Sequence, residues 1–151
     1  MTPTEPTHRA FDTDRLLSAV ERAVSERMRV ALEPAGLDLE EWRVLSLLSD
    51  GEGHTMAETA EFALLPPPTL TKVVNRLVSN NLVHRRTGTI DRRQVLIRTT
   101  TRGQQKFDDV VGTIESLQRT LFGSDSDRDL FTTALTAALE KTTSDKVPAD
   151  H

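Results

Sequence analysis

The chain has 151 residues, of which 28% are charged and 36% apolar, with 19 Lys and Arg, 23 Asp and Glu, and no Cys. This length allows one domain with a real core or two small lobes that share one, and the composition is typical of a soluble, helix-rich globular protein. The absence of Cys excludes disulfides, thiolate metal sites and thiol redox switches, and no apolar run approaches the roughly 18 residues that a membrane span needs.

The chain begins with a Thr- and Pro-rich stretch, MTPTEPTHRAFD. It lacks the basic-then-apolar order of a signal peptide, so we expect a cytoplasmic protein. Residues 1–11 and 143–151 are expected to be flexible ends.

Two helices are predicted next. Apolar residues at helical spacing run through residues 12–32, and Pro34 stops this helix. Asp38 followed by Glu41 is a capping box, which opens a second helix, LEEWRVLSLLS, that ends at Asp50 and the glycine after it.

A third and a fourth helix are separated by the sequence LLPPP. Thr55 and Glu58 form another capping box, which opens a short helix to about Ala63. The fourth helix is predicted over residues 68–79, because Pro68 can be the first helical residue, where a missing N–H costs nothing. Its two sides differ sharply: one is apolar (Leu70, Val73, Val74, Leu77, Val78) and the other polar (Thr69, Thr71, Lys72, Asn75, Arg76, Ser79).

The period then changes to that of strands. LVHRR and QVLIR are short β-prone runs separated by TGTID, which predicts a two-stranded hairpin with Gly88 in its turn. Thr101 and Gln104 open another helix, and a last helix is predicted over residues 127–142.

Positive charge is concentrated in one quarter of the chain. Residues 66–102 hold eight basic residues and one acid, a net +7, so the remainder sums to −11 because the whole chain is at −4. This split favours a basic segment that meets a polyanion over charge scattered by chance. The basic residues are Lys72, Arg76, Arg85, Arg86, Arg92, Arg93, Arg98 and Arg102.

The order of elements predicts a mainly α fold with a small β-hairpin wing, which is the layout of a winged helix-turn-helix with an added helical lobe. An α-helix enters the B-DNA major groove, and arginines reach into narrow minor grooves. We assign residues 12–35 and 102–142 to the helical lobe and residues 36–101 to the DNA-binding domain.

Four stretches also resemble the MarR family of transcriptional regulators: LEEWRVLSLL, TMAETAE, PTLTKVVNRLVSNNLVHRR and DRRQVLIRTTTRG. The resemblance implies a homodimeric, sequence-specific DNA-binding regulator, usually a ligand-responsive repressor, on a near-palindromic operator. It also implies that the helical lobe formed by the chain ends is the helical dimerisation lobe. It also implies that Asp91 holds Arg93 for entry into the minor groove and that Arg86 is a wing-base arginine. The chain departs from the family at Pro66-Pro67-Pro68 and at Thr100-Thr101. The predicted double-stranded DNA contacts are Thr55, Pro68, Thr69, Thr71, Lys72, Asn75, Arg76, Arg86, Asp91, Arg92 and Arg93.

Family members commonly bind small organic acids, often aromatic, and Arg27 is a candidate contact. It lies in the apolar stripe of the first helix beside Ala23, Val24 and Ala31, where an unpaired guanidinium is costly. It either binds a ligand carboxylate or phosphate, with Met28, Trp42 and Arg43 as further pocket walls, or it pairs with an acid of the other subunit or reaches water. Trp42 is equally explained as core. The effector's identity is left open.

Other functions find less support. His54 and Glu58 have metal-ligand spacing, but Glu58 is better explained by its capping box, so we expect no metal and no cofactor beyond an effector. No catalytic motif is present, so we expect no enzyme. The alternative function is an interaction module whose basic face binds an acidic protein partner.

Overall fold

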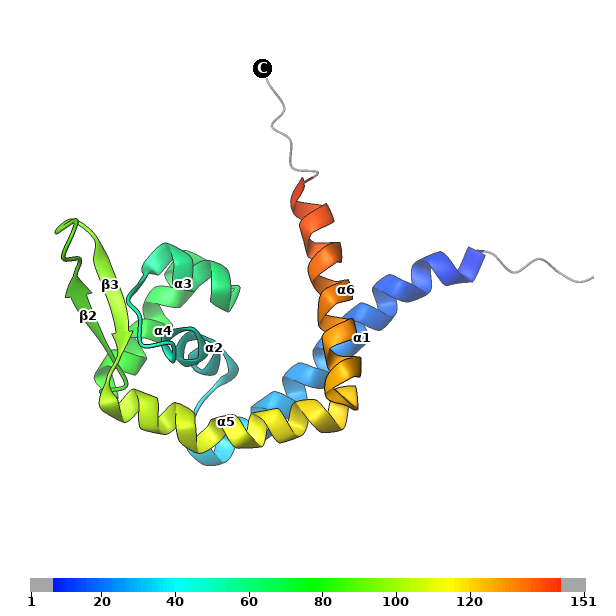
Figure 1. Ribbon diagram of the computed structural model, residues 1–151, viewed down its shortest axis with the longest axis horizontal. Coiled ribbons are helices and arrows are strands. Elements are labelled where there is room, and N and C mark those ends of the chain that lie inside the picture. The colour runs from blue at the N-terminus through cyan, green and yellow to red at the C-terminus, as the bar shows by residue number, and fades with distance from the viewer. Residues whose placement is uncertain (1–6, 145–151) are drawn as a thin grey trace, which may run out of the picture. The chain divides into compact units, whose positions relative to one another are not determined.

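The computed structural model describes residues 7–144, with side chains from residue 12 onward. Within this range the chain forms six α-helices, one 3₁₀ turn and three strands (Figure 1). The elements are α1 (Thr7–Leu32), η1 (Glu33–Ala35), α2 (Leu39–Leu48), β1 (His54–Thr55), α3 (Met56–Ala63), α4 (Pro67–Ser79), β2 (Val83–Thr87), β3 (Val95–Thr99), α5 (Thr101–Phe122) and α6 (Asp125–Ser144).

The predicted mainly α fold with a β wing is confirmed, but the first and last helices are longer than predicted. Helix α1 begins at Thr7, not at residue 12, and α6 extends to Ser144, so residues 7–11 and 143–144 are helical. The expectation of flexible ends for residues 1–6 and 145–151 lies outside the described residues. No helix within residues 7–144 combines the length and apolar character needed to cross a bilayer.

The described chain falls into two compact units, divided between Thr113 and Ile114. The first contains α1 to β3 and the start of α5, and the second contains the end of α5 and α6. The predicted assignment of residues 12–35 and 102–142 to one lobe stays a prediction about the assembled protein.

Local capping sets the first helices of the winged-helix region. Both predicted capping boxes are present: the Asp38 carboxylate accepts from the Glu41 amide at 2.8 Å, and the Thr55 hydroxyl accepts from the Glu58 amide at 3.1 Å. Each N3 glutamate accepts in return from the amide of its cap residue. Four orphan helix donors are satisfied in this way, which explains why α2 and α3 begin where they do.

The turn between α3 and α4 brings the two helices together. Leu64 takes the left-handed conformation, with φ of 57°, and the Leu65 amide donates to the Ala60 carbonyl at 3.0 Å. Helix α4 then starts at Pro67 rather than at Pro68, because two successive prolines both occupy its first turn, where no amide donor is required.

The wing is a three-stranded antiparallel sheet in the order β1-β3-β2, so the prediction of a two-stranded hairpin was incomplete. Strand β1 adds the pairs His54 with Ile97 and Thr55 with Leu96. A Cβ on Gly53 would lie 3.1 Å from the Leu96 side chain, so a small residue lets the chain approach β3.

The start of α5 contacts the short segment that joins α4 to β2. The Thr100 hydroxyl accepts from the Gly103 amide at 2.9 Å, so the cap is Thr100 and not the predicted Thr101. A Cβ on Gly103 would lie 2.0 Å from the Leu82 carbonyl oxygen, which leaves room only for glycine. The Thr100 amide donates to that same carbonyl at 3.0 Å.

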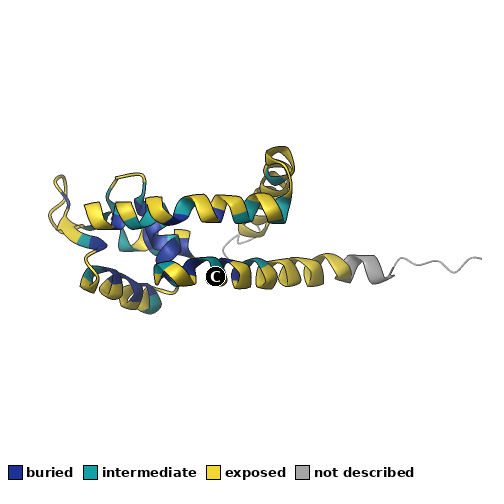
Figure 2. Ribbon diagram, turned by 90° about the horizontal axis from the view of Figure 1, so that it is seen from below, coloured by how far each residue is buried: buried dark blue, intermediate teal, exposed yellow. Residues whose placement is uncertain are grey.

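One apolar core supports these elements, and in Figure 2 the buried residues gather there while the long helices are largely exposed. Its largest fully buried apolar residues come from α1, α2, α4, β2 and β3: Leu32, Val44, Leu45, Leu48, Leu70, Val73, Val74, Leu77, Val83 and Ile97. Truncating one such leucine to alanine costs about 2–5 kcal/mol, so this core fixes the position of α4 against the sheet.

Candidate nucleic-acid interface

The two sides of α4 separate as predicted. Leu70, Val73, Val74 and Leu77 are no more than 2% exposed, whereas Thr71, Lys72, Asn75 and Arg76 are all exposed and Thr69 is half-buried. The core therefore anchors one side of the helix and presents the polar side to solvent, as a helix that enters a DNA groove requires.

Arg76 differs from the other polar residues of this side because it is already paired. Its guanidinium lies 2.6 Å from the Asp38 carboxylate and 3.4 Å from Glu41, the two residues of the α2 capping box. The side chain thus ties the last turn of α4 to the start of α2. This geometry supports a structural role rather than the predicted DNA contact.

Asn75 links α4 to the wing. The Arg85 guanidinium donates to the Asn75 side-chain oxygen at 2.6 Å. Arg85 pairs with Ile97 in the sheet, and opposed residues share a face, so its side chain leaves the sheet on the side of the buried Ile97. Arg85 was not among the predicted site residues, although strand alternation from Val83 could have placed it on this face.

The remaining predicted contacts in this region have different surroundings. The Thr71 hydroxyl donates to the Pro67 carbonyl at 3.0 Å, and the Thr55 hydroxyl serves the α3 cap. Pro68 is exposed at the start of α4. Lys72 is exposed, and within residues 12–144 its ammonium group has no recorded ion pair or hydrogen bond. Lys72 is therefore the free cation of α4.

The wing tip is a tight loop, residues 88–94. The Gly88 amide donates to the Gln94 carbonyl at 2.7 Å, and the Gln94 amide donates to the Asp91 carbonyl at 3.1 Å. The Asp91 carboxylate accepts from the Arg93 backbone amide at 2.9 Å. The acid thus shapes the turn through the Arg93 backbone, whereas the resemblance implied that it holds the arginine itself.

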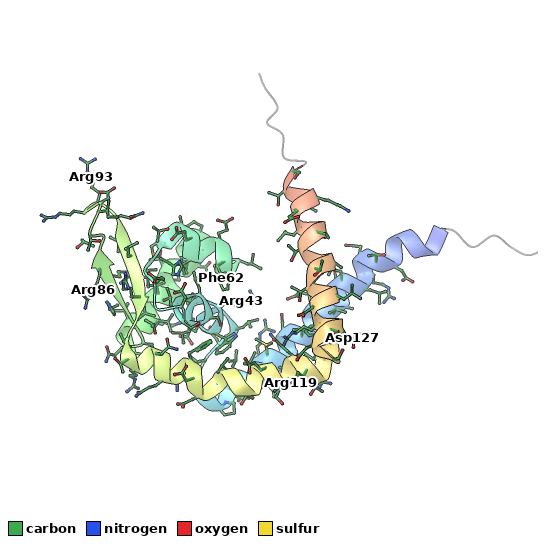
Figure 3. The ribbon with its side chains drawn as sticks, in the orientation of Figure 1. Arg43, Phe62, Arg86, Arg93, Arg119 and Asp127 are labelled. Carbon is green, nitrogen blue, oxygen red and sulfur yellow. The ribbon has the colours of Figure 1, made fainter. Side chains whose placement is uncertain are left out.

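Arg92 and Arg93 are both exposed, and in Figure 3 Arg93 points outward from the tip of the hairpin. Among residues 12–144 no acceptor for either guanidinium is recorded. Asp91 is the one acid of residues 66–102, and its carboxylate is used by the turn. The wing tip is therefore a compact source of positive potential.

The base of the wing holds a second group of cations on the outer face of the sheet. The Arg86 guanidinium donates to the His84 ring at 3.0 Å, and Arg98, paired with His84 across the strands, donates to the Gly51 carbonyl at 3.0 Å. Burial, together with the nearby Arg86 and Arg98, lowers the pKa of His84 below its usual value. The lowered pKa favours the neutral His84 ring, which accepts from the guanidinium of Arg86, a residue that lies on β2 in Figure 3.

The residues predicted to line an effector pocket do not converge. Arg27 is exposed, because the inward face of α1 runs through Ser25, Met28 and Leu32 instead of the predicted stripe. The premise of a buried, unpaired guanidinium is therefore wrong for the single chain. Met28 is 9% exposed and belongs to the core.

Trp42 and Arg43 also have structural contacts. The Trp42 ring is 7% exposed and stacks on Phe107, with ring centroids 5.1 Å apart. Arg43 donates to the Ala63 carbonyl at 3.5 Å and so bridges α2 and α3. Both contacts belong to the packing of the first unit.

An open cavity of about 540 Å³ lies beside Arg76. Its charged lining is Glu26, Glu33, Asp38 and Glu41 against Arg29 and Arg76, and none of the four predicted pocket residues is among the residues that line it. Because carboxylates outnumber guanidinium groups there, the cavity disfavours an anionic ligand.

His54 has two acidic neighbours. Its Nε2 lies 2.8 Å from Asp50, and its Nδ1 lies 3.8 Å from Glu58, whose carboxylate completes the α3 capping box. Partial burial works to raise the pKa of Asp50, but the Glu52 amide, His54 and Arg98 outweigh it and lower that pKa. Among the described residues there is no group of three or more side chains arranged to hold a metal ion.

The chain is similar to known regulators in sequence. A family profile described as transcriptional regulator SarA/Rot matches residues 28–110, which is more than half of the chain. The uncharacterized HTH-type transcriptional regulator YwoH of Bacillus subtilis is 30% identical over 89 residues, 59% of this chain, and the match spans 64% of YwoH, a little under two thirds of its length. The HTH-type transcriptional regulator FarR of Neisseria gonorrhoeae is 27% identical over 108 residues, 72% of this chain and 73% of FarR.

The chain is also similar to solved structures of MarR family regulators. AbsC from Streptomyces coelicolor superposes with a TM-score of 0.80 at 22% identity, covering 94% of this chain and 99% of AbsC. CouR from Rhodococcus jostii RHA1, solved with p-coumaroyl-CoA, gives a TM-score of 0.76 at 26% identity, covering 97% and 99%. A mutant of MarR from E. coli, solved with operator DNA, gives 0.75 at 20% identity, covering 90% and 99%.

Proposed function

Because this chain belongs to the SarA/Rot family of winged-helix transcriptional regulators, we propose that it binds a near-palindromic DNA operator as a homodimer. In each subunit α4 enters the major groove, and the wing tip enters the adjacent minor groove. Lys72 and Asn75 contact bases or phosphates from α4, and Arg92 and Arg93 do so from the wing.

The observation that carries this proposal is the hydrogen bond between Arg85 and Asn75. It joins the exposed side of α4 to the wing, so that the two elements form one basic surface on a rigid core. The similar fold of the E. coli MarR mutant, which was solved with operator DNA, supports DNA binding by a chain of this fold. The acidic residues in the rest of the chain do not prevent DNA binding. Salt screens exposed charges over about 8–10 Å, so DNA responds mainly to the charges of the surface that it contacts.

The dimer is supported by apolar side chains that the single chain leaves exposed. Helix α6 has no buried residue among those described, and its Leu130 and Leu139 are 72% and 66% exposed. In the first unit, Leu16 and Leu17 of α1 are about half exposed. Helices owe most of their stability to packing of an apolar face, so we propose that a second copy covers these residues.

We further propose that the regulator is a repressor released by an aromatic or other organic acid. Repression is the sign that the resemblance to the MarR family implies. The support for an effector is the likeness to CouR, solved with p-coumaroyl-CoA, a thioester of an aromatic acid. A further structure of this fold, NadR (TM-score 0.69, 22% identity), was solved with 4-hydroxyphenylacetate, a free aromatic acid. We expect such a compound to raise the Tm of the protein and to release the operator duplex; compounds that do neither count against this effector class.

The first experiment is selection of bound duplexes from a random DNA pool at physiological salt. We expect enrichment of an inverted repeat with half-sites about one helical turn apart. Failure of the 151-residue chain to enrich any motif contradicts operator binding and favours the alternative, in which the basic face binds an acidic protein.

A pair of arginine variants sharpens the selection. Arg93→Ala should weaken binding of the selected duplex, whereas Arg119→Ala removes an exposed arginine of the second unit, which is not part of the assigned surface, and should leave binding unchanged. Equal weakening by both substitutions indicates a response to net charge alone and contradicts the assigned surface.

A further inference from the structure

Ile90 is a large apolar side chain at the wing tip that the rest of the chain leaves uncovered. It is 102% exposed, whereas Val83 and Ile97 of the same hairpin are 1% and 0% exposed. Apolar side chains of a hairpin ordinarily pack on the core side of the sheet. Ile90 instead lies beyond the ends of both strands, between Thr89 and Asp91.

The loop holds Ile90 in a defined position. The Gly88–Gln94 and Gln94–Asp91 backbone bonds close the tip, and the Asp91 carboxylate fixes the turn that follows. A Cβ on Gly88 would lie 2.7 Å from the Asp91 carbonyl oxygen, so the two sides of the loop touch just below Ile90. The backbone that carries Ile90 is therefore held in place, and Arg92 and Arg93 follow it within three residues of the chain.

These neighbours indicate what Ile90 meets. A single side chain is too small for a protein interface, and two exposed arginines beside it make an apolar partner unfavourable. The minor groove of DNA is about 6 Å wide, carries negative potential between its phosphates, and has an apolar sugar lining. Proteins that bind this groove read it with arginines and other polar side chains, and they frequently insert an apolar side chain such as isoleucine or leucine between base steps.

We propose that Ile90 contacts the floor of the minor groove and makes the wing select A·T over G·C pairs. This inference rests on the proposed function, because it requires the wing to enter that groove. An A·T pair presents only acceptors there, whereas a G·C pair adds the guanine N2 amino group. Ile90 collides with that amino group and cannot accept its hydrogen bond, so a buried donor is left unsatisfied.

Ile90 and Arg93 then read the same groove in different ways. Arginine favours a narrow groove through its negative potential, an effect that salt screens. The contact of Ile90 is steric and depends on one exocyclic amino group. Selectivity from Ile90 therefore persists at high salt, and it disappears when the side chain is shortened.

The test begins by locating the base pairs under the wing. The chain contains no Cys, so Thr89→Cys provides a single attachment point for an iron–EDTA cleavage reagent. Cleavage of the duplex enriched by selection identifies the pairs that the tip reaches. Each is then replaced by G·C, by inosine·C, which lacks the amino group, or by diaminopurine·T, which adds it to an A·T pair.

We expect the unsubstituted protein to bind A·T and inosine·C duplexes about tenfold more tightly than G·C and diaminopurine·T duplexes, within the usual range for one unfavourable pair. Ile90→Ala should reduce this ratio to about twofold or less. Its loss of affinity for the A·T duplex should be smaller than the loss caused by Arg93→Ala. The Tm of the Ile90→Ala variant should equal that of the unsubstituted protein, because the removed atoms are fully exposed. Val95→Ala shortens a partly exposed residue of β3 as the matched control and should keep the full ratio.

The inference is overturned while operator binding stands if Ile90→Ala retains the full ratio, or if the unsubstituted protein binds all four duplexes equally. If selection enriches no duplex at all, the proposed function and this inference fail together. Loss of selectivity in Val95→Ala as well as Ile90→Ala also contradicts the role of Ile90, because it assigns the effect to the hairpin as a whole.

Discussion

Helix α4 and the wing tip both present cations to solvent, but they hold them differently. On α4, Arg76 is paired with Asp38 and Glu41, and Asn75 accepts from Arg85. At the wing tip the backbone is held by Asp91, while the guanidinium groups of Arg92 and Arg93 extend without a recorded partner among residues 12–144. A positioned helix is suited to reading bases, and free arginines are suited to supplying charge, so substitutions in the two elements should have separable effects.

The largest expected effect is that of Arg93→Ala on DNA affinity. A dimer uses the residue twice, so we expect a loss of about 2 kcal/mol, roughly thirtyfold, across many sequences. A dimer that contacts about eight phosphates should show a log–log salt slope of about −7, and the variant about −5. Titration of the selected duplex at several salt concentrations measures both. An unchanged slope removes the wing tip from the interface, and a flat response of the unsubstituted protein contradicts the basic surface.

Arg76→Ala should instead affect the fold. It breaks the link between α4 and the α2 capping box and leaves Glu41, which is 7% exposed, without its cation. Because Arg76 itself is half exposed, we expect a loss of only about 1 kcal/mol in the free energy of unfolding, measured with urea.

The matched variant is Lys72→Ala, one turn earlier on the same side of α4. It should change the free energy of unfolding by less than about 0.5 kcal/mol, but it should relax the preference at particular base pairs. If Arg76→Ala relaxes base preference without loss of stability, Arg76 is a DNA contact after all and the contrast between the two elements is weaker than the structure indicates.

The sequence predicted what depends on near neighbours. Both capping boxes join residues three apart, and the two sides of α4 follow from the helical period, so each could be found by spacing alone. The role of Arg76 could not, because its partner Asp38 lies 38 residues away in the chain. Strand β1 has only two residues, too few to show a period.

The candidate effector site shows the same limit. Residues Ala23, Val24 and Ala31 indicated an inward stripe through Arg27, but α1 is turned so that its buried face runs through Ser25 and Met28. A helix with small apolar residues on several sides has no unique inward direction until its partner is known. Tertiary packing, which the sequence pattern does not contain, decided the exposure of Arg27.

Gly88→Ala tests whether the shape of the wing tip matters as well as its charge. The added Cβ would lie 2.7 Å from the Asp91 carbonyl oxygen, so the loop must shift and move Arg92 and Arg93. We expect DNA affinity to fall by about 1 kcal/mol with the salt slope unchanged. Gly112→Ala is the control, because its Cβ meets nothing within 4 Å in helix α5; it should keep affinity and raise stability by up to about 1 kcal/mol. A Gly88 variant with full affinity shows that charge alone is sufficient at the tip.

The smallest expected effect concerns His84 at the wing base, and it distinguishes the base from the freely exposed tip. Burial and the facing Arg86 and Arg98 lower the pKa of His84 in the folded protein. The folded state therefore binds the proton less readily than the unfolded state, so stability is intact above the unfolded pKa of about 6.5 and is lost as pH falls through it toward the lower folded pKa.

His84→Gln removes this loss. We expect the free energy of unfolding to fall less between pH 7.5 and pH 5.5 in the variant than in the unsubstituted protein, because contributions common to both proteins cancel in the difference. If the free energy of unfolding depends on pH in the same way in both proteins, Arg86 and Arg98 are too well solvated to lower the pKa of His84.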